Sequence, residues 1–379
     1  MFLRKLPFAT SRCLASPLAF PTHTSKAPLL RRNFHVEGLA LAPVLFGGLL
    51  VSLWTWKCFM MVAFQNKIIY MPGMPPNSRW EKIDDYEDRL AGILWREERI
   101  RAADGTDLAL CVADVELGSK RGSSSSDTAF YVLYFQGNAS STPPRLPDLS
   151  STLSMLRREM AANRGSARCT MVCLSYRGYW TSRGRPTEPG LRLDSAAAID
   201  WISHMHQEAS PLDLRGTRRP AELVLWGQSI GSGVATNLAA EKTMPEGLRL
   251  NSLVLETPFT SIRAMLEVLY PQKWLPYKYL WPFLRNHLDS WKNLKLIADK
   301  YSSANVSMPE VLIVQAAKDE LVPAELSQKL HDRCVEVQIP VHRAEVSGAF
   351  HNDALFRTEG KKAVSQFLAQ KIRESRKEV

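Results

Sequence analysis

The feature that most constrains the fold is a short segment, Gly227-Gln228-Ser229-Ile230-Gly231, which lies between two apolar stretches of different kinds. The stretch before it, Leu223-Val224-Leu225-Trp226, is continuously apolar, as in a strand covered on both faces. The stretch after it has helical spacing as far as Lys242. A Gly-x-Ser-x-Gly segment between a strand and a helix predicts a sharp, strained turn that exposes the serine hydroxyl. Ser229 is therefore the candidate nucleophile, with Gly227, Gln228 and Gly231 forming the turn around it.

The rest of the chain from residue 91 alternates strand-like and helix-like runs. We expect strands at Glu97–Arg101, Leu108–Val115, Phe130–Phe135, Cys169–Ser175, Ala221–Trp226, Ser252–Glu256, Pro309–Gln315 and Glu336–Val346. We expect helices at Ser151–Asn163, Pro189–His206, Ser229–Lys242, Pro323–Arg333 and Asp353–Arg373. This alternation predicts a mostly parallel sheet with helices on both faces. Functional side chains should then follow the carboxyl ends of the strands.

Two such side chains, an aspartate and then a histidine, follow predicted strands downstream of the serine. Asp319 follows the strand Pro309–Gln315, and it lies 90 residues after Ser229. His351 follows the last predicted strand, 32 residues further on. Serine, acid and histidine in this chain order form the triad of the α/β-hydrolase fold. His351 would act as the base and Asp319 would orient it, with the neighbouring Glu320 as an alternative acid.

The seven other histidines fit this role poorly. They lie near the N-terminus, within predicted helices or strands, or in the segment 262–307 between the nucleophile and the acid: His23, His35, His204, His206, His287, His331 and His342.

An oxyanion hole is expected near the loop after the strand Phe130–Phe135. In this fold one backbone N–H comes from that loop and another from the residue after the nucleophile. These positions are Asn138 and Ile230. The sequence Asn138-Ala139-Ser140 also has the form of a glycosylation site, but its place in the loop favours a buried position.

Residues 64–370 resemble the single-pass α/β-hydrolase-domain proteins, which include lysophospholipid and monoacylglycerol lipases and protein depalmitoylases. The resemblance rests on Ser175-Tyr176-Arg177-Gly178-Tyr179, on Glu256-Thr257-Pro258-Phe259-Thr260-Ser261 and on His351-Asn352-Asp353. It implies the same triad of Ser229, Asp319 and His351. Two positions depart from the family pattern, because Gln136 replaces the usual histidine and Ser175 the usual aspartate.

The segment 262–307 is expected to form a small helical cap over the pocket. It contains seven aromatic residues: Tyr270, Trp274, Tyr277, Tyr279, Trp281, Phe283 and Trp291. These either bind a hydrophobic substrate or simply pack the cap on the core. The family resemblance favours a lipid or acyl ester as the substrate.

The N-terminal region has the features of a targeting peptide followed by a membrane-spanning helix. Residues 1–36 contain six basic residues and no acidic ones, which is the composition of a mitochondrial transit peptide. The stretch 38–57 is apolar up to Lys57, long enough to cross a bilayer as a helix, and it ends in Trp54 and Trp56 at the level of an aromatic belt. We expect a targeting peptide at 1–36 and a single-pass membrane protein, with the mitochondrial inner membrane favoured over the endoplasmic reticulum. Residues 58–90 read as a proline-broken connector to a hydrolase domain at 91–379.

The composition argues against several other classes of protein. The net charge of +10 is concentrated in residues 1–57, where seven basic residues face one acidic residue, so no broad surface for nucleic acid is indicated. None of the six cysteines forms a Cys-x-x-Cys pair or a zinc-like cluster. No metal or cofactor is expected, and the expected partners are a lipid or acyl-ester substrate and a membrane bilayer.

The sequence therefore predicts a membrane-anchored serine hydrolase that cleaves esters or thioesters through an acyl-enzyme. Two alternatives remain open. One is a catalytically idle scaffold with the same fold, and the other is a different nucleophilic chemistry on the same triad, such as that of a haloperoxidase or a peptidase.

Overall fold

The computed structural model describes residues 36–119, 128–161, 165–210 and 219–377. The targeting sequence expected at 1–36 lies, except for Val36, outside these residues. The chain divides into two units, Met1–Leu53 and Trp54–Val379.

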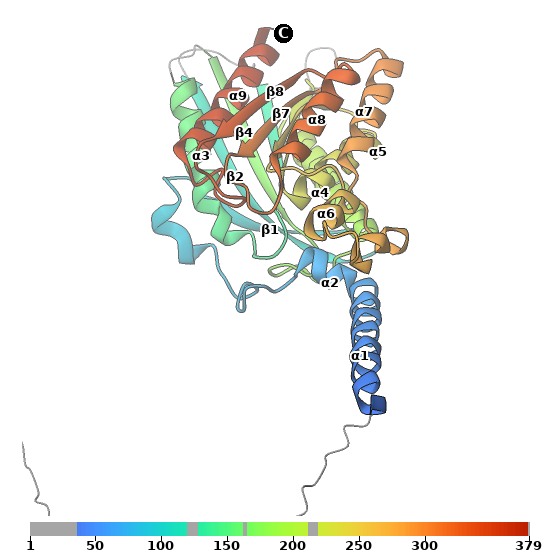
Figure 1. The fold of residues 1–379 in the computed structure, drawn as a ribbon. Coiled ribbons are helices and arrows are strands. Elements are labelled where there is room, and N and C mark those ends of the chain that lie inside the picture. The colour runs from blue at the N-terminus through green and yellow to red at the C-terminus, as the bar shows by residue number, and fades with distance from the viewer. Residues whose placement is uncertain (1–35, 120–127, 162–164, 211–218, 378–379) are drawn as a thin grey trace, which may run out of the picture. The chain divides into compact units, whose positions relative to one another are not determined.

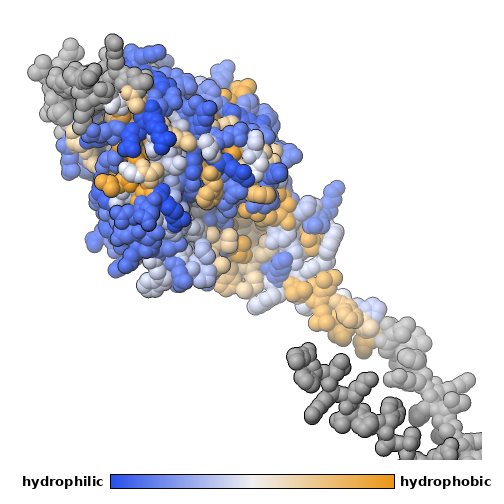
Figure 2. All heavy atoms as spheres, turned by 90° about the vertical axis from the view of Figure 1, so that its left-hand side faces the viewer, coloured by the Kyte–Doolittle hydropathy of each residue, from blue (hydrophilic) through white to orange (hydrophobic). Residues whose placement is uncertain are grey.

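Helix α1, Val36–Ala63, carries the predicted membrane span and runs past it. Leu41–Ala63 has the length and the apolar composition that a helix needs to cross a bilayer. The exposed apolar side chains of this helix stand out in the hydropathy view (Figure 2).

The unit Trp54–Val379 is built on one eight-stranded sheet with the order β1-β2-β4-β3-β5-β6-β7-β8 (Figure 1). Strand β2 pairs antiparallel with both β1 and β4, and all the other pairs are parallel. The strands are β1 Trp95–Arg101, β2 Asp107–Ser119, β3 Thr128–Phe135, β4 Gly165–Ser175, β5 Ala221–Gln228, β6 Leu248–Glu256, β7 Glu310–Ala316 and β8 Val341–Val346. The predicted mostly parallel sheet is confirmed.

Helices cover both faces of this sheet, and each face has its own apolar core. One core includes side chains of α4, α5, α7 and α8, and the other includes side chains of α3 and α9. The α-helices of this unit are α2 Gln65–Tyr70, α3 Leu146–Met160, α4 Glu188–Ala209, α5 Ile230–Glu241, α6 Ile262–Leu269, α7 Ser290–Ala304, α8 Ala324–Glu336 and α9 Thr358–Lys377. Short 3₁₀ helices are η1 Asp84–Arg89, η2 Pro143–Arg145 and η3 Pro276–Phe283.

Several expected boundaries are wrong, among them the start of α3, which lies at Leu146 rather than at Ser151. The last strand was predicted from Glu336, but α8 continues to Glu336 and β8 begins only at Val341. The terminal helix starts at Thr358 rather than at Asp353, because turns occupy the chain after the histidine loop. Helix α7, in the second half of the segment expected to form a cap, packs on the sheet, since Leu294 and Ile297 are buried in its core. We use the name cap for residues 262–289, the part of that segment before α7.

The predicted connector 58–90 packs on the domain instead of only linking two parts. It contains α2 and η1, and the side chain of Tyr70 is fully buried in the core. The Tyr70 hydroxyl donates to Asn286 Oδ1 at 3.0 Å, which ties this segment to the end of the cap.

Candidate active site

The nucleophile elbow joins β5 to α5 at Ser229. This serine has φ 51° and ψ −116°, a backbone conformation that costs a non-glycine residue energy and persists only when its surroundings hold it. The neighbouring strand supplies one such restraint, because the Ser229 N–H donates to Glu256 O at 2.8 Å. The turn therefore fixes the serine at the carboxyl edge of the sheet, and its side chain is almost fully buried.

Backbone contacts leave no room for side chains at the two flanking glycines. A Cβ on Gly227 would lie 2.2 Å from Gly231 O, and a Cβ on Gly231 would lie 2.1 Å from Phe135 O. Both separations are far below any real carbon–oxygen contact. The Gly-x-Ser-x-Gly pattern is thus explained by strand β3 and helix α5 closing on the turn from both sides.

The structure brings Ser229, His351 and Asp319 together. His351 Nε2 lies 3.0 Å from Ser229 Oγ, and His351 Nδ1 lies 2.8 Å and 3.0 Å from the two carboxylate oxygens of Asp319. The His351 and Asp319 side chains are 3% and 5% exposed. With a proton on Nδ1 shared with Asp319, the Nε2 atom is free to accept the serine proton.

The loop after β7 holds the carboxylate of Asp319 in place. Its Oδ1 atom accepts hydrogen bonds from the backbone N–H groups of Leu321 at 3.0 Å and Val322 at 2.8 Å. Glu320, the alternative acid, points elsewhere, because its carboxylate accepts the backbone N–H of His351 at 3.0 Å. Glu320 therefore holds the histidine loop while Asp319 faces the imidazole.

The candidate oxyanion donors lie on the two sides of the elbow. Ile230 is the first residue of α5, so its N–H has no partner within the helix. Asn138 lies in the loop after β3, and the next two residues of that loop are tied to the connector. Ala139 N donates to Tyr70 O at 3.0 Å, and Ser140 N donates to Met74 O. Nothing in the sequence indicated that the connector braces this loop.

The two departures from the family pattern both have structural roles. Gln136 Oε1 accepts from Thr142 Oγ1 at 3.0 Å, and Gln136 O accepts from the Tyr176 hydroxyl at 3.0 Å. Ser175 Oγ donates to Tyr179 O at 3.2 Å. Both residues thus hold turns that border the site.

A buried ion pair behind the elbow was not predicted from the sequence. Arg145 pairs with Glu256, the residue whose backbone oxygen holds Ser229 N–H, and both side chains are almost fully buried. Burial alone lowers the pKa of Arg145, but the adjacent Glu256 carboxylate and Tyr134 raise it above its ordinary value. Arg145 therefore remains a cation.

The same arginine touches two further parts of the site. Its Nε donates to the Tyr134 hydroxyl at 3.1 Å, and that hydroxyl donates to Gln228 Oε1 at 3.2 Å. Its guanidinium also donates to Asn352 O at 3.5 Å, next to His351. Arg145 thereby connects the elbow with the histidine loop. Glu256 stood in a family motif, whereas no sequence signal marked Arg145.

The four buried cysteines of the described ranges, Cys111, Cys169, Cys173 and Cys334, are unsuited to nucleophilic chemistry. Burial raises the pKa of the Cys169 and Cys334 thiols to about 12, and that of Cys173 well above its ordinary value. The described residues also contain no group of three or more His, Cys, Asp or Glu that could hold a metal ion.

Comparison with known proteins gives the following relatives. No family model matches the chain. The α/β-hydrolase domain-containing protein WAV2 of Arabidopsis thaliana is 29% identical over 286 residues, which cover 73% of this chain and 77% of that protein. The lysophosphatidylserine lipase ABHD12 of Danio rerio is 34% identical over 164 residues, 43% of this chain and 38% of that protein. The chain spans 58% of the length of two curated mycobacterial relatives, at 32% identity.

Among solved structures, the esterase Pf2001 of Pyrococcus furiosus aligns with a TM-score of 0.49 and 18% identity, covering 75% of this chain and 92% of its own.

The strand order and the serine elbow at the carboxyl edge of the sheet define an α/β-hydrolase fold. The homologues of the chain are α/β-hydrolase domain-containing proteins, as the sequence motifs predicted.

Proposed function

We propose that this chain is a membrane-anchored serine hydrolase that cleaves the carboxylic ester or thioester bonds of lipid or acyl substrates. The observation that carries the proposal is the pair of contacts made by His351, with Nε2 3.0 Å from Ser229 Oγ and Nδ1 2.8 Å from Asp319. This arrangement matches the nucleophile, base and orienting acid of acyl transfer.

In the first half of the reaction, Ser229 Oγ attacks the carbonyl carbon of the substrate while His351 Nε2 takes the hydroxyl proton. The carbonyl electron pair moves to oxygen, where the N–H groups of Asn138 and Ile230 stabilise the negative charge. Asp319 stabilises the imidazolium that forms. His351 then gives its proton to the leaving alcohol or thiol, the bond to the leaving group breaks, and an acyl-enzyme remains.

In the second half, water replaces the leaving group. His351 takes a proton from water, the resulting nucleophile attacks the acyl carbon, and the second oxyanion is held by the same two N–H groups. When this intermediate collapses, Ser229 regains its proton from His351 and the carboxylic acid leaves. No cofactor or metal is needed for any of these steps.

A lipid or acyl substrate is supported by two features. The name lysophosphatidylserine lipase belongs to a homologue that aligns over 43% of this chain. Helix α1 is long and apolar enough to place the enzyme on a membrane, where such substrates lie.

The proposed location is the mitochondrial inner membrane, with the endoplasmic reticulum as the alternative. The support is the composition of residues 1–36, which are basic and lack acidic side chains. A fluorescent-protein fusion of the full chain would show the compartment, and removal of residues 1–34 should abolish a mitochondrial signal. Unchanged mitochondrial targeting after this truncation would contradict the transit-peptide assignment.

Turnover of a panel of acyl esters and thioesters by the full chain in detergent micelles tests the proposed activity. The wild type should release acid from at least one class, and Ser229→Ala should reduce this rate to background. A folded wild type that hydrolyses none of them would favour the alternative of an idle scaffold.

A further inference from the structure

The cap exposes an unusual number of aromatic side chains. Trp274 is 67% exposed and Phe283 60% exposed, and Tyr279 and Trp281 are exposed as well. The last turns of α1 and the start of α2 add Phe59 and Phe64. We call these residues, together with the basic residues named next, the cap surface. Soluble surfaces rarely gather aromatic rings at this density, whereas the interface of a membrane favours them.

The charge of the cap surface has one dominant sign. The segments 54–71 and 262–285 contain one acidic residue, Glu267, and six basic residues, namely Lys57, Lys67, Arg263, Lys273, Lys278 and Arg285. Arg263 lies over the ring of Trp281 with its Cζ 4.1 Å from the centroid. Aromatic rings interleaved with cations match the headgroup region of an anionic leaflet.

The cap packs directly on the last turns of α1. The rings of Trp54 and Trp274 are 5.8 Å apart, and Lys57 Nζ lies 4.3 Å from the centre of the Tyr277 ring. Arg285 donates to Val62 O at 2.9 Å. These contacts fix the cap beside the end of the helix.

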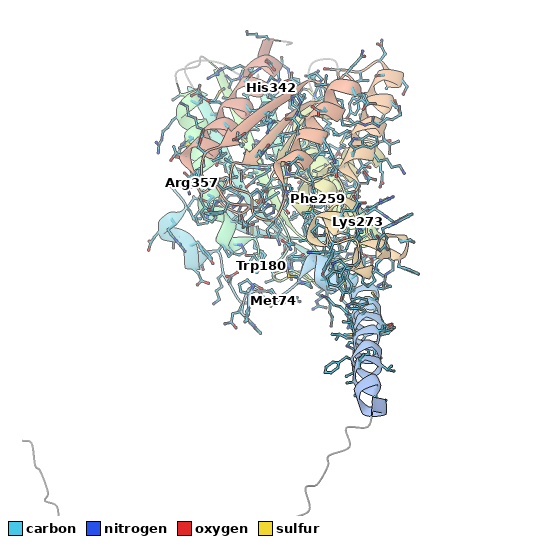
Figure 3. All side chains as sticks on the ribbon, viewed as in Figure 1. Met74, Trp180, Phe259, Lys273, His342 and Arg357 are labelled. Carbon is cyan, nitrogen blue, oxygen red and sulfur yellow. The ribbon has the colours of Figure 1, made fainter. Side chains whose placement is uncertain are left out.

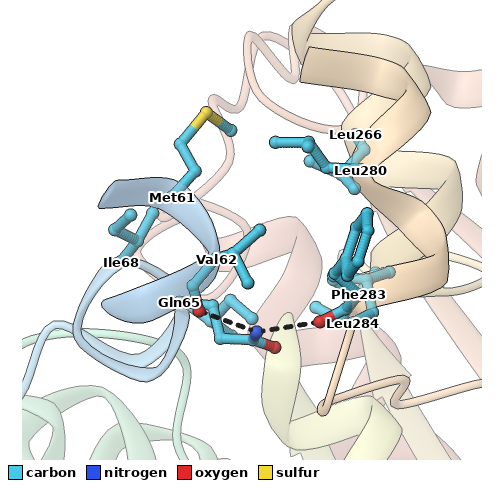
Figure 4. Close-up of a pocket in the computed structure, with 10 residues that line it drawn as sticks. Met61, Val62, Gln65, Ile68, Leu266, Leu280, Phe283 and Leu284 are labelled. Atoms are coloured by element: carbon cyan, nitrogen blue, oxygen red, sulfur yellow. Dashed lines mark hydrogen bonds between the residues drawn. The ribbon is translucent and has the colours of Figure 1, made fainter. Parts of the chain in front are cut away.

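An apolar pocket of about 60 Å³ lies within this contact (Figure 4). Its walls come from the end of α1, from α2 and from the cap, and they include Met61, Ile68, Leu266, Leu280 and Phe283. The last turns of α1 are therefore partly covered by protein, which argues that the lipid-facing part of the helix ends near Lys57.

The length of α1 indicates where the cap lies relative to the membrane interface. The 20 residues from 38 to 57 extend about 30 Å as a helix, which is the thickness of the hydrocarbon core. Trp54 and Trp56 then lie at the interface, where an aromatic belt belongs. Because Trp274 contacts Trp54, it lies at this same level.

We propose that the cap surface is a second membrane contact, which rests in the headgroup region of an anionic leaflet beside α1. The inference rests on the part of the proposed function that makes α1 a membrane span, and it is independent of the chemistry at Ser229. It would hold the cap of the enzyme against the surface from which a lipid substrate must come.

Site-specific fluorescence quenching in vesicles tests this contact on the full chain. The fluorophore NBD is attached to the cysteine of Trp274→Cys, in a background that also carries Cys13→Ser and Cys58→Ser. The other four cysteines are buried. The matched control is Val335→Cys, an exposed position at the end of α8 shortly before β8 begins, and therefore at the amino-terminal edge of the sheet. The labelled His342, at the start of β8, marks this edge in Figure 3.

Vesicles of phosphatidylcholine, with and without phosphatidylglycerol, contain lipids with a nitroxide close to the headgroup. We expect the probe at Trp274 to lose most of its fluorescence and the probe at Val335 to lose little. Anionic lipid should increase the difference. Lys273→Glu together with Lys278→Glu should remove this increase, and Lys329→Glu on α8 should leave it unchanged. Ser229→Ala should behave as wild type.

Three results would overturn the proposal. The first is equal, weak quenching at the two sites. The second is a probe at Trp274 that is shielded from aqueous iodide but not quenched by lipid, which would mean that a protein or a second copy of the chain covers the surface. The third is a wild-type chain that does not remain with the vesicles, which would remove the membrane span while leaving hydrolysis by Ser229 untouched.

Discussion

At the scale of single residues, the site depends on two adjacent carboxylates that do different work. Asp319 contacts the imidazole of His351, and Glu320 accepts the backbone N–H of the same histidine. The sequence places both in one loop and predicts Asp319 as the acid, with Glu320 as the alternative, since chain order does not show which way two neighbouring side chains point. In the structure, the Asp319 side chain points to the imidazole ring and the Glu320 side chain points to the backbone of the histidine loop.

Substitution of each carboxylate by its amide should therefore give unequal results. Asp319→Asn favours the wrong tautomer of His351 and should lower kcat by about 10⁴-fold, as the same change does in another serine triad. Glu320→Gln keeps a hydrogen-bond acceptor for the loop and should lower kcat by less than about tenfold. Steady-state turnover of one ester measures both. Equal losses, or a larger loss for Glu320→Gln, would contradict the assignment.

Substitution of Arg145 tests whether its ion pair with Glu256 stabilises the fold around the elbow. Arg145→Met leaves Glu256 buried without its cation and should lower the free energy of unfolding by about 3–5 kcal/mol. Arg145→Met with Glu256→Met removes both charges and should recover much of that loss, since buried pairs are often replaced at little cost. Denaturant unfolding measures both variants. A single variant as stable as wild type would show that the pair is not needed to hold the elbow.

At the scale of helices and strands, sequence patterns predicted most elements but missed where some of them end. The sequence predicts one strand over 336–346, yet its first residues close α8 and make a turn, because the helix buries Leu330 and Cys334 in the core. The segment 262–307 is likewise expected to be a single cap, whereas its second half forms α7, which packs on the sheet. Where these helices end depends on how they pack in the core, and the local sequence pattern does not encode that packing.

One carboxylate joins α4, α5 and the end of the cap. Glu188 accepts the backbone N–H groups of His287 and Leu288, and also bonds Asn237 on α5 at 3.0 Å. Burial by itself raises the pKa of Glu188, but these hydrogen bonds and Arg192 lower it below its ordinary value of 4.5. A lowered pKa in the folded state stabilises the fold above pH 4.5, and this stabilisation is lost as the pH falls through the folded value.

Glu188→Gln should remove this pH dependence. At neutral pH the variant should lose about 1.5–3 kcal/mol of unfolding free energy, the usual worth of hydrogen bonds to a charged group. As the pH falls below 4.5, wild type should lose stability faster than the variant, so the two unfolding curves should converge. Parallel curves across this range would contradict the role assigned to Glu188.

At the scale of the whole molecule, α1 decides whether the hydrolase domain works on a membrane. The apolar helix was predicted from the sequence and is present, although it runs six residues beyond Lys57. What the sequence did not predict is that these last turns, with α2 and Tyr70, pack on the hydrolase unit. The domain therefore begins earlier in the chain than a change in composition suggested.

Extraction of native membranes with alkaline carbonate tests the anchor. Wild type should stay with the membrane pellet. Leu49→Arg with Leu50→Arg should release the chain, because each arginine at the centre of a span costs about 2.5–3.5 kcal/mol. Leu94→Arg, at an exposed site outside the helix, is the matched control and should stay in the pellet. Release of the wild type would contradict a membrane span.

The central claim is that Ser229 is a nucleophile activated by His351. A fluorophosphonate probe reacts with such a serine, and mass spectrometry of the digested protein identifies the modified residue. The full chain in its membrane should carry one phosphonyl adduct on the peptide that contains Ser229, and both Ser229→Ala and His351→Ala should lack it. A folded wild type that takes up no probe, or an adduct that persists in Ser229→Ala, would contradict the account.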